Sequence, residues 1–200
     1  MAGWALGLLI AYLALAFGVR VGVAVRTTGT TGIANPLAAP PMEVLGGALF
    51  IAALLMGSLT PPLVLAGALE TIDPLDRSGF HAVGFMFAGT GIAGTFAAQM
   101  AMGSSWRIGV DQSERTDLIT GGVFSLCRNP IYSFMVIAWI GLSLLVPTWL
   151  SIASIPLGVL AFQVQVRLVE EPFLISAHGE PYLVWARRVG RFVPGVGRLP

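Results

Sequence analysis

The sequence predicts an all-α integral membrane protein with about five transmembrane helices and a cytoplasmic C-terminal helical tail. Of its 200 residues, 56% are hydrophobic and only 10% are charged, whereas a soluble domain usually carries about 25% charged residues. Five apolar stretches approach the roughly 20 residues that a membrane-spanning helix needs. These stretches are 3–25, 43–69, 80–102, 131–146 and 149–168.

The first three stretches carry local features that refine this prediction. Stretch 3–25 lacks a basic segment before its apolar core, so we interpret it as a transmembrane helix rather than a signal peptide. Two adjacent prolines at 61–62 predict a kink or break late in the second stretch. Residues 89–94 match the dinucleotide pattern GxGxxG literally, but that pattern requires a preceding strand. Inside an apolar helix, such small residues instead predict close helix packing.

The last two stretches are separated only by Pro147 and Thr148, which predicts a tight antiparallel hairpin. The tail from 169 to 188 has helical character. Within it, Gly179-Glu-Pro181 predicts a break between two short helices.

The arginines predict the orientation in the membrane. All eleven basic residues are Arg, and an alternating topology places ten of them on one side, with Arg77 alone on the other. The positive-inside rule makes the arginine-rich side cytoplasmic. We therefore expect a multi-pass protein of the cell inner membrane, with the N-terminus outside and the C-terminus inside. Residues 1–102 would supply three helices and residues 103–200 the functional region of one structural unit.

Composition also excludes some functions. The net charge of +1 gives no indication of a nucleic-acid partner. A single cysteine, Cys127, and two histidines do not supply the usual ligands of a zinc site, so we expect no metal.

Residues 128–132, Arg-Asn-Pro-Ile-Tyr, stand just before the fourth stretch. Pro130 suits the first turn of a helix, and Asn129 can cap it. One interpretation is simply a helix start with Tyr132 at the membrane interface. The other is a ligand site, because a helix N-terminus offers free N–H groups. The guanidinium of Arg128 could also donate two hydrogen bonds to a carboxylate or phosphate.

Two adjacent carboxylates, Glu170 and Glu171, follow the fifth stretch. In an interfacial crevice they could hold an ammonium, a sulfonium or ribose hydroxyls. Alternatively, they form salt bridges to Arg128, Arg187 or Arg191 and mark only the membrane edge. Because consecutive helical residues point about 100° apart, at most one of the two need face a ligand directly.

The end of the chain is both basic and aromatic. It contains Tyr182, Trp185 and arginines at 187, 188 and 191. The simplest interpretation is an amphipathic segment on anionic lipid. An aromatic side chain here could also stack on a purine, and an arginine could hold a carboxylate.

Together these motifs resemble the isoprenylcysteine carboxyl methyltransferase and phospholipid methyltransferase superfamily of integral membrane enzymes. The motifs that carry the resemblance are Thr120-Gly121, Phe124, Arg128-Asn129-Pro130-Ile131-Tyr132, Glu170-Glu171, Gly179-Glu-Pro-Tyr182 and Arg191-Phe192-Val-Pro194. Asn129 stands where the superfamily commonly has His, which looks closer to the phosphatidylethanolamine methyltransferase branch. Asn cannot act as a titratable base near neutral pH.

The resemblance implies S-adenosylmethionine as cofactor and methyl donor. It implies a lipid-like acceptor, such as a prenylcysteine carboxylate or a phospholipid amine, which enters from the bilayer at the cytoplasmic interface. The implied cofactor-binding residues are Gly121, Arg128, Asn129, Pro130, Tyr132, Glu170, Glu171, Tyr182 and Arg191. The implied catalytic residues are Glu171, Arg128 and Asn129, with Glu171 as the candidate to accept a proton from an amine.

Two alternatives belong to other classes. A membrane reductase of the steroid-reductase type would bind NADPH, and Trp106-Arg107-Ile-Gly109 is reminiscent of that group. A non-catalytic membrane protein would instead pair Glu170, Glu171 and Arg128 only with one another and leave no cavity.

Overall fold

The computed structural model describes residues 1–34, 39–109 and 116–200. Three charged residues of the loop after the third apolar stretch, Asp111, Glu114 and Arg115, lie outside the described residues. The described part contains helices and isolated bridges but no strand. Its longer helices are α1 (Ala2–Leu13), α2 (Arg20–Thr28), α3 (Pro41–Leu65), α4 (Ser78–Ala101), α5 (Pro130–Leu145), α6 (Trp149–Gln165), α7 (Glu171–His178) and α8 (Glu180–Arg188). Shorter helical turns are η1 (Ala14–Val19), η3 (Gly103–Ser105), η4 (Gly122–Ser125) and η5 (Val166–Glu170).

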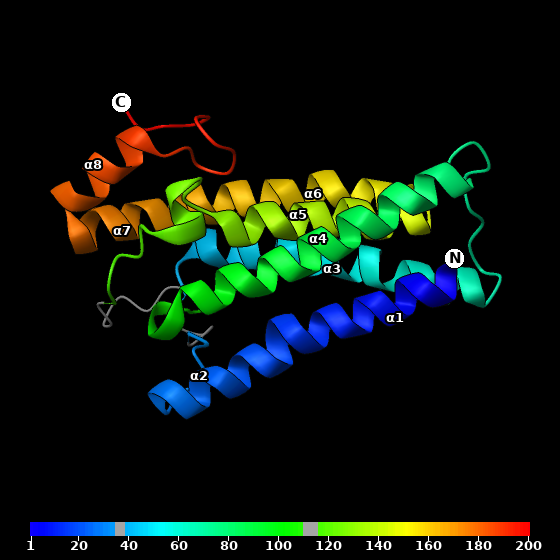
Figure 1. Cartoon of the computed structure of the whole chain (residues 1–200), viewed down its shortest axis with the longest axis horizontal. Coiled ribbons are helices and arrows are strands. Elements are labelled where there is room, and N and C mark those ends of the chain that lie inside the picture. Colours follow the sequence, from blue (N-terminus) through cyan, green and yellow to red (C-terminus); the bar gives the residue numbers. More distant parts are fainter. Residues whose placement is uncertain (35–38, 110–115) are drawn as a thin grey trace.

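Five apolar helical segments run along the long axis of the molecule (Figure 1). Four of them, Ala2–Thr28, Pro41–Leu65, Ser78–Ala101 and Trp149–His178, are long and apolar enough to cross a membrane, and α5 is a shorter apolar helix. The predicted all-α integral membrane protein is thereby confirmed. The fifth segment extends beyond the predicted stretch, because the π-helical turn η5 joins α6 to α7 without interruption.

Small residues hold α4 against α5. A Cβ atom on Gly91 would lie 2.2 Å from the backbone nitrogen of Ala138, and one on Gly94 would lie 2.3 Å from the ring of Phe134. Neither position has room for a side chain. Two of the three glycines in residues 89–94, Gly91 and Gly94, therefore pack against α5 as expected, whereas a Cβ atom on Gly89 would meet nothing within 4 Å.

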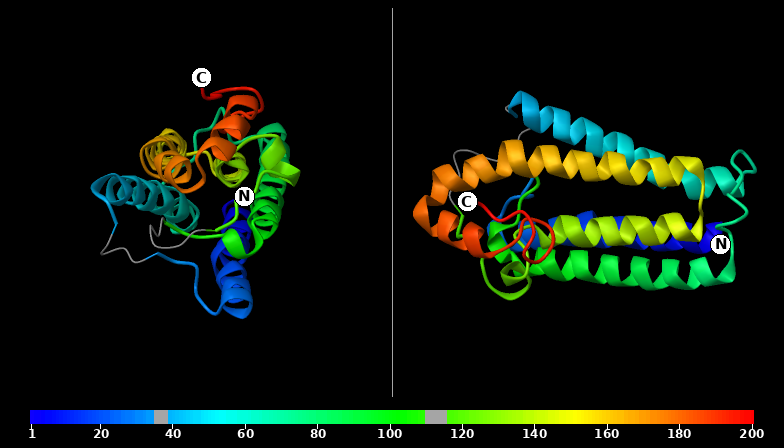
Figure 2. Two further views of the ribbon diagram at one scale, coloured as in Figure 1. Left: turned by 90° about the vertical axis from the view of Figure 1, so that its left-hand side faces the viewer. Right: turned by 90° about the horizontal axis from the view of Figure 1, so that it is seen from above.

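The predicted hairpin between α5 and α6 is present. Thr148 and Ser151 form a capping box, in which each side-chain oxygen accepts a hydrogen bond from the other residue's backbone N–H, at 3.0 and 3.1 Å. The two helices nevertheless diverge from this turn, as the right view of Figure 2 shows. α5 packs mainly on α4, whereas α6 packs mainly on α3.

The break predicted at the prolines of α3 is not observed, because the helix continues through Pro61 and Pro62 to Leu65. Each proline removes one backbone donor. Since the helix ends three residues after Pro62, little helix remains to be redirected.

The bundle has one polar end, which comprises the described residues of 20–34, 103–132 and 165–200. There α8 folds back across the bundle (Figure 1). The turn that permits this is Gly179, whose φ of 59° and ψ of −133° are accessible to glycine but not readily to other residues. The predicted break between two short tail helices is confirmed.

Arg20 lies inside the first helical segment and is only 1% exposed. Its Nη2 donates to the Gly103 carbonyl at 2.5 Å, and its guanidinium lies 4.5 Å from the centroid of the Trp106 ring. This cation–π contact fixes the end of the first segment to the loop that follows α4.

Candidate functional site

The site begins with a backbone pairing at the start of α5. The N–H of Arg128 donates to the Gly190 carbonyl at 2.8 Å, and the N–H of Asn129 donates to the Arg191 carbonyl at 3.0 Å. A Cβ atom on Gly190 would lie 2.1 Å from the Val193 carbonyl oxygen, so only glycine fits there. The C-terminal segment is thus held beside the N-terminus of α5.

The side chain of Arg128 joins these segments further. Its Nη1 donates to the carbonyls of Ala186 at 2.9 Å and Val189 at 2.5 Å, while its Nη2 donates to the Gly197 carbonyl at 3.1 Å. Nη2 also donates to Oε1 of Glu171 at 2.6 Å. The side chain is 1% exposed. Arg128 therefore places a buried, paired charge at the junction of α5, α7 and the C-terminal segment.

Glu171 is held by two guanidinium groups. Besides Arg128, Arg191 donates from Nε to Oε1 at 2.8 Å and from Nη2 to Oε2 at 2.9 Å. This is the two-pronged geometry that makes arginine–carboxylate pairs strong. The hydrogen bond to Glu171 raises the pKa of Arg191. Both oxygens of Glu171 are therefore occupied by positively charged donors.

Glu170 has a different environment. The Tyr132 hydroxyl donates to Oε1 of Glu170 at 2.5 Å, and the side chain of Gln165 lies close enough to act on this carboxylate. The Tyr132 ring stacks on Phe162, with a centroid distance of 4.6 Å. The two adjacent glutamates thus face different partners, as the helical geometry requires.

Asn129 does not cap α5 with its side chain, in contrast to our expectation. Its Nδ2 instead donates to the Arg191 carbonyl at 3.0 Å. Its side-chain oxygen makes no capping hydrogen bond to the helix. Pro130 is the first residue of the helix, as predicted.

Tyr182 lies on the buried face of α8 and is 1% exposed. Burial raises its pKa to about 12, so the phenol stays protonated at neutral pH. Its ring meets that of Trp185 edge to face at 5.7 Å. Within the described part of the chain, the buried atoms Nε1 of Trp185 and Nε of Arg128 have no hydrogen-bond partner.

The structure brings most of the predicted residues into one cluster. Arg128, Asn129, Pro130, Tyr132, Glu170, Glu171, Tyr182 and Arg191 come together from α5, the α6–η5–α7 segment and the C-terminal segment. Gly121 lies apart from them, exposed at the start of η4. Its predicted role stays a prediction.

Two further residues of this region were not expected from the sequence. Ser133 donates to the carbonyls of Asn129 at 3.1 Å and Phe192 at 2.6 Å. Glu43 lies in the first turn of α3, close enough for its charge to act on Tyr132 and Glu170. Glu43 is the only charged residue in α3, and a charge in an apolar helix is the pattern that could have revealed it.

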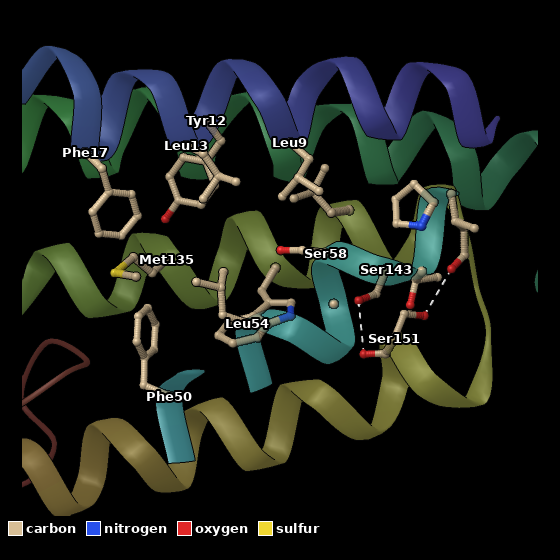
Figure 3. Close-up of a pocket in the computed structure, with 16 residues that line it drawn as sticks. Leu9, Tyr12, Leu13, Phe17, Phe50, Leu54, Ser58, Met135, Ser143 and Ser151 are labelled. Atoms are coloured by element: carbon tan, nitrogen blue, oxygen red, sulfur yellow. Dashed lines mark hydrogen bonds between the residues drawn. The ribbon is translucent and has the colours of Figure 1, made fainter. Parts of the chain in front are cut away.

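An apolar pocket lies between α1, α3 and α5, with a free volume of about 40 Å³. Figure 3 shows it extending from Phe17, Phe50 and Met135 to Ser143 and Ser151. Its lining residues are Leu9, Tyr12, Leu13, Phe17, Phe50, Leu54, Gly57, Ser58, Thr60, Pro61, Met135, Trp139, Leu142, Ser143, Val146 and Ser151. No group of three or more potential metal ligands is present among the described residues.

Comparison with known proteins agrees with this arrangement. Residues 80–181, about half of the chain, match the profile of the phospholipid methyltransferase family. No curated protein sequence matches the chain. Among solved structures, the chain is similar to the eukaryotic intramembrane Ras methyltransferase ICMT (isoprenylcysteine carboxyl methyltransferase), with 17% identity and a TM-score of 0.61. The match covers 95% of this chain and 67% of that one, and at this identity it shows a shared fold.

Proposed function

Because this chain belongs to the phospholipid methyltransferase family, we propose that it transfers a methyl group from S-adenosylmethionine to a lipid-like acceptor at the membrane interface. The observation that carries the proposal is the cluster at the polar end. There the buried Arg128–Glu171–Arg191 network lies beside the Tyr132–Glu170 pair. Four of these five residues lie within the matched part of the chain, namely Arg128, Tyr132, Glu170 and Glu171.

The polar groups of the cluster fit the chemistry of the cofactor. S-adenosylmethionine carries a carboxylate, an ammonium and ribose hydroxyls, and when bound it supplies a methyl group already activated by a sulfonium. Arg191 uses Nε and Nη2 for Glu171, which leaves Nη1 for the carboxylate. Glu170 would accept hydrogen bonds from the ammonium or ribose. The buried Nε1 of Trp185 offers a further donor.

The two glutamates would have separate roles. Glu171 is held by two guanidiniums, which stabilise its ionised form and make it a poor proton acceptor. Glu170 accepts a hydrogen bond from the neutral hydroxyl of Tyr132, and no salt bridge to it is found among the described residues. The sequence assigned proton acceptance to Glu171, whereas the geometry favours Glu170. If the acceptor is an amine, Glu170 would receive its proton, and Glu171 would hold Arg128 and Arg191 in position.

The other groups of the cluster would orient the reactants and exclude water. Asn129 and Arg128 tie the C-terminal segment to α5, and α8 covers the cluster beyond the turn at Gly179. Holding donor and acceptor in line, away from water, is the main requirement for this reaction. By the distribution of arginines, this end would face the cytoplasm.

The motif that suggested a reductase has a structural explanation. Trp106, which prompted it, packs against the guanidinium of Arg20. This contact gives the motif a structural role.

The test is calorimetric titration of the detergent-solubilised protein with S-adenosylhomocysteine, with NADPH in parallel. We expect micromolar binding of S-adenosylhomocysteine that is weakened in Glu170→Gln. Glu180→Gln is the matched control, because Glu180 is an exposed glutamate on α8 that pairs with Arg187. Binding of NADPH alone would support a reductase. No binding of either ligand by folded protein would support a non-catalytic membrane protein.

A further inference from the structure

The C-terminal segment contains a tight turn with an apolar tip. Its four residues are Val193, Pro194, Gly195 and Val196, and the N–H of Val196 closes the turn by donating to the Val193 carbonyl at 3.1 Å. Proline and a glycine with positive φ, here 76°, are the residues that a β-turn favours at its two central positions. Val193 is 56% exposed and Val196 is 64% exposed. The turn therefore presents two apolar side chains on the surface.

Hydrogen bonds fix the depth of this turn relative to the bundle. The backbone N–H of Asn129 donates to the Arg191 carbonyl at 3.0 Å. The Ser133 hydroxyl donates to the Phe192 carbonyl at 2.6 Å, so the segment before the turn runs beside the first turn of α5 (Figure 2). α5 is an apolar helix of 16 residues, which corresponds to about 24 Å, whereas the hydrocarbon core of a bilayer is about 30 Å thick. The valines thus lie near the edge of the bilayer.

Three exposed arginines lie close to the turn. Nη2 of Arg198 is 3.6 Å from the position that a Cβ atom on Gly195 would take. Arg187 and Arg188 end α8, and Nε of Arg187 donates to the Pro200 carbonyl at 3.1 Å, which brings the segment after the turn back to α8. Neither Arg188 nor Arg198 forms an ion pair with a described residue. Two positive charges beside the turn are therefore free to meet an anion.

The apolar side of α8 is not available for a membrane contact. The sequence favours an amphipathic tail that lies on anionic lipid, with its aromatic residues at headgroup depth. In the structure, Tyr182 and Ala186 are buried, at 1% and 0% exposed. Because α8 turns this side inward, the apolar part of such a contact has to come from the valines of the turn.

We propose that the tail binds the surface of an anionic bilayer through a tail surface that comprises Arg187, Arg188, Val193, Val196 and Arg198. The valines enter the upper acyl region, and the guanidinium groups pair with lipid phosphates. Exposed apolar side chains flanked by basic ones are typical of interfacial anchors, and basic residues near a membrane are attracted to anionic lipids. The lipid acts here as a docking surface and not as a methyl acceptor, so the inference goes beyond the proposed function.

Docking of the tail surface would also secure the buried charge network. Arg191 precedes the turn and donates from Nε and Nη2 to Glu171. Gly197 follows the turn, and its carbonyl accepts from Nη2 of Arg128 at 3.1 Å. Both sides of the turn are therefore tied to the Arg128–Glu171–Arg191 network. A bilayer that holds the turn restricts the motion of this network.

The test measures contact between the turn and lipid. Val196→Cys is labelled with bimane in the full chain and reconstituted into nanodiscs that contain a lipid with a nitroxide near the top of its acyl chain. The native Cys127 is buried, so the unsubstituted protein serves as the blank. We expect strong quenching in phosphatidylglycerol. The quenching should weaken in phosphatidylcholine and at high salt, because salt screens exposed charges.

A second probe position controls for depth. Ser176 is exposed on α7, six residues after Glu170, which is about 9 Å further along the helix. Bimane on Ser176→Cys should therefore remain in water and stay unquenched in every lipid. Equal quenching at both positions would contradict the depth assigned to the turn.

A matched pair of double variants tests the arginines. In the Val196→Cys background, Arg188→Gln with Arg198→Gln should raise the fraction of phosphatidylglycerol needed for half-maximal quenching. Each lost arginine should weaken docking about fivefold. Arg26→Gln with Arg167→Gln removes the same charge from exposed arginines of α2 and η5 and should leave the curve unchanged.

Three results would overturn the inference. The first is an unquenched bimane at Val196→Cys in phosphatidylglycerol, and the second is quenching that does not depend on anionic lipid or on the two arginines. The third is protection of Val196→Cys from maleimide in native membranes without quenching in nanodiscs, which would assign the tail surface to a protein partner.

Titration of S-adenosylhomocysteine into the same nanodiscs keeps this inference apart from the proposed function. If the methyltransferase proposal holds, phosphatidylglycerol should tighten the binding of S-adenosylhomocysteine, and Arg188→Gln with Arg198→Gln should remove this effect. Lipid-dependent quenching without any binding of S-adenosylhomocysteine would support the tail surface and contradict the methyltransferase proposal alone.

Discussion

At the scale of single residues, Glu171 is distinguished by its two cationic partners. Its side chain is 7% exposed and its oxygens accept from Arg128 and Arg191. Removing one partner of a buried ion network leaves the others uncompensated, which typically costs about 3–5 kcal/mol. Glu171→Ala should therefore lower the free energy of unfolding by about that amount, measured by thermal denaturation in detergent.

The control for this prediction is Glu180→Ala. That glutamate pairs with Arg187, but both side chains are about half exposed or more. Such surface pairs contribute roughly 0–1 kcal/mol. Equal stability losses in the two variants would show that the Arg128–Glu171–Arg191 network does not stabilise the fold.

Tyr182 leads to a prediction about pH. Burial raises its pKa to about 12 from its ordinary value of 10.0. Because the folded pKa is the higher one, the stabilisation is fully present below pH 10 and is lost as the pH rises toward 12. The shift corresponds to about 3 kcal/mol. Between these pH values, the unfolding free energy of the wild-type protein should fall more steeply than that of Tyr182→Phe, as followed by thermal melts; parallel profiles would contradict the burial of the phenol.

The residues of the site could largely be predicted from the sequence, but which charged side chains pair with one another could not. The residue types and their order placed Arg128, Tyr132 and the two glutamates at one interface. The sequence did not show which glutamate meets the arginines, because that depends on the rotation of α7 and the path of the C-terminal segment. Ser133 was missed for the same reason, since its partner is the carbonyl of Phe192.

At the scale of helices, the contact between α4 and α5 depends on glycine. A Cβ atom on Gly91 would meet the backbone of Ala138 at 2.2 Å, whereas a Cβ atom on Gly89 would meet nothing within 4 Å. Gly91→Ala should therefore destabilise the protein by about 1–3 kcal/mol through overpacking. Gly89→Ala should be neutral or stabilising by up to about 1 kcal/mol, because alanine favours the helix.

Thermal unfolding of the two variants in the same detergent checks this prediction. The two glycines belong to one helix and one motif, so differences in membrane insertion affect both alike. A loss of stability in Gly89→Ala equal to that in Gly91→Ala would mean that α4 and α5 do not pack as described.

The positions of the helices could be predicted from the sequence, but their neighbours could not. Hydropathy reports how much of a segment can face lipid, so all five apolar segments were located to within a few residues, apart from the extension into α7. Hydropathy does not report which helix lies beside which. The divergence of α5 and α6 and the passage of α3 through Pro61 and Pro62 depend on tertiary contacts that a single sequence does not display.

At the scale of the whole molecule, polarity is distributed unevenly between the two ends. The topology predicted from the sequence places ten of the eleven arginines at one end of the bundle, together with α8 and the proposed methyl-transfer site. Arg77 lies in the loop that joins α3 to α4. Under the proposed function, an acceptor drawn from the bilayer and a water-soluble cofactor would meet at this end. The orientation of the bundle thus decides which compartment supplies the cofactor.

This orientation can be tested with introduced cysteines. Burial raises the pKa of the native Cys127 thiol, so the wild-type protein should react poorly with maleimides and serve as the blank. Ala68→Cys lies in the exposed loop after α3, and Ser176→Cys is exposed on α7 at the polar end. In intact cells, a membrane-impermeant maleimide should label Ala68→Cys, whereas Ser176→Cys should be labelled only after lysis. The reverse pattern would place the cluster outside the cell, away from cytoplasmic S-adenosylmethionine, and would contradict both the positive-inside assignment and the proposed source of the methyl group.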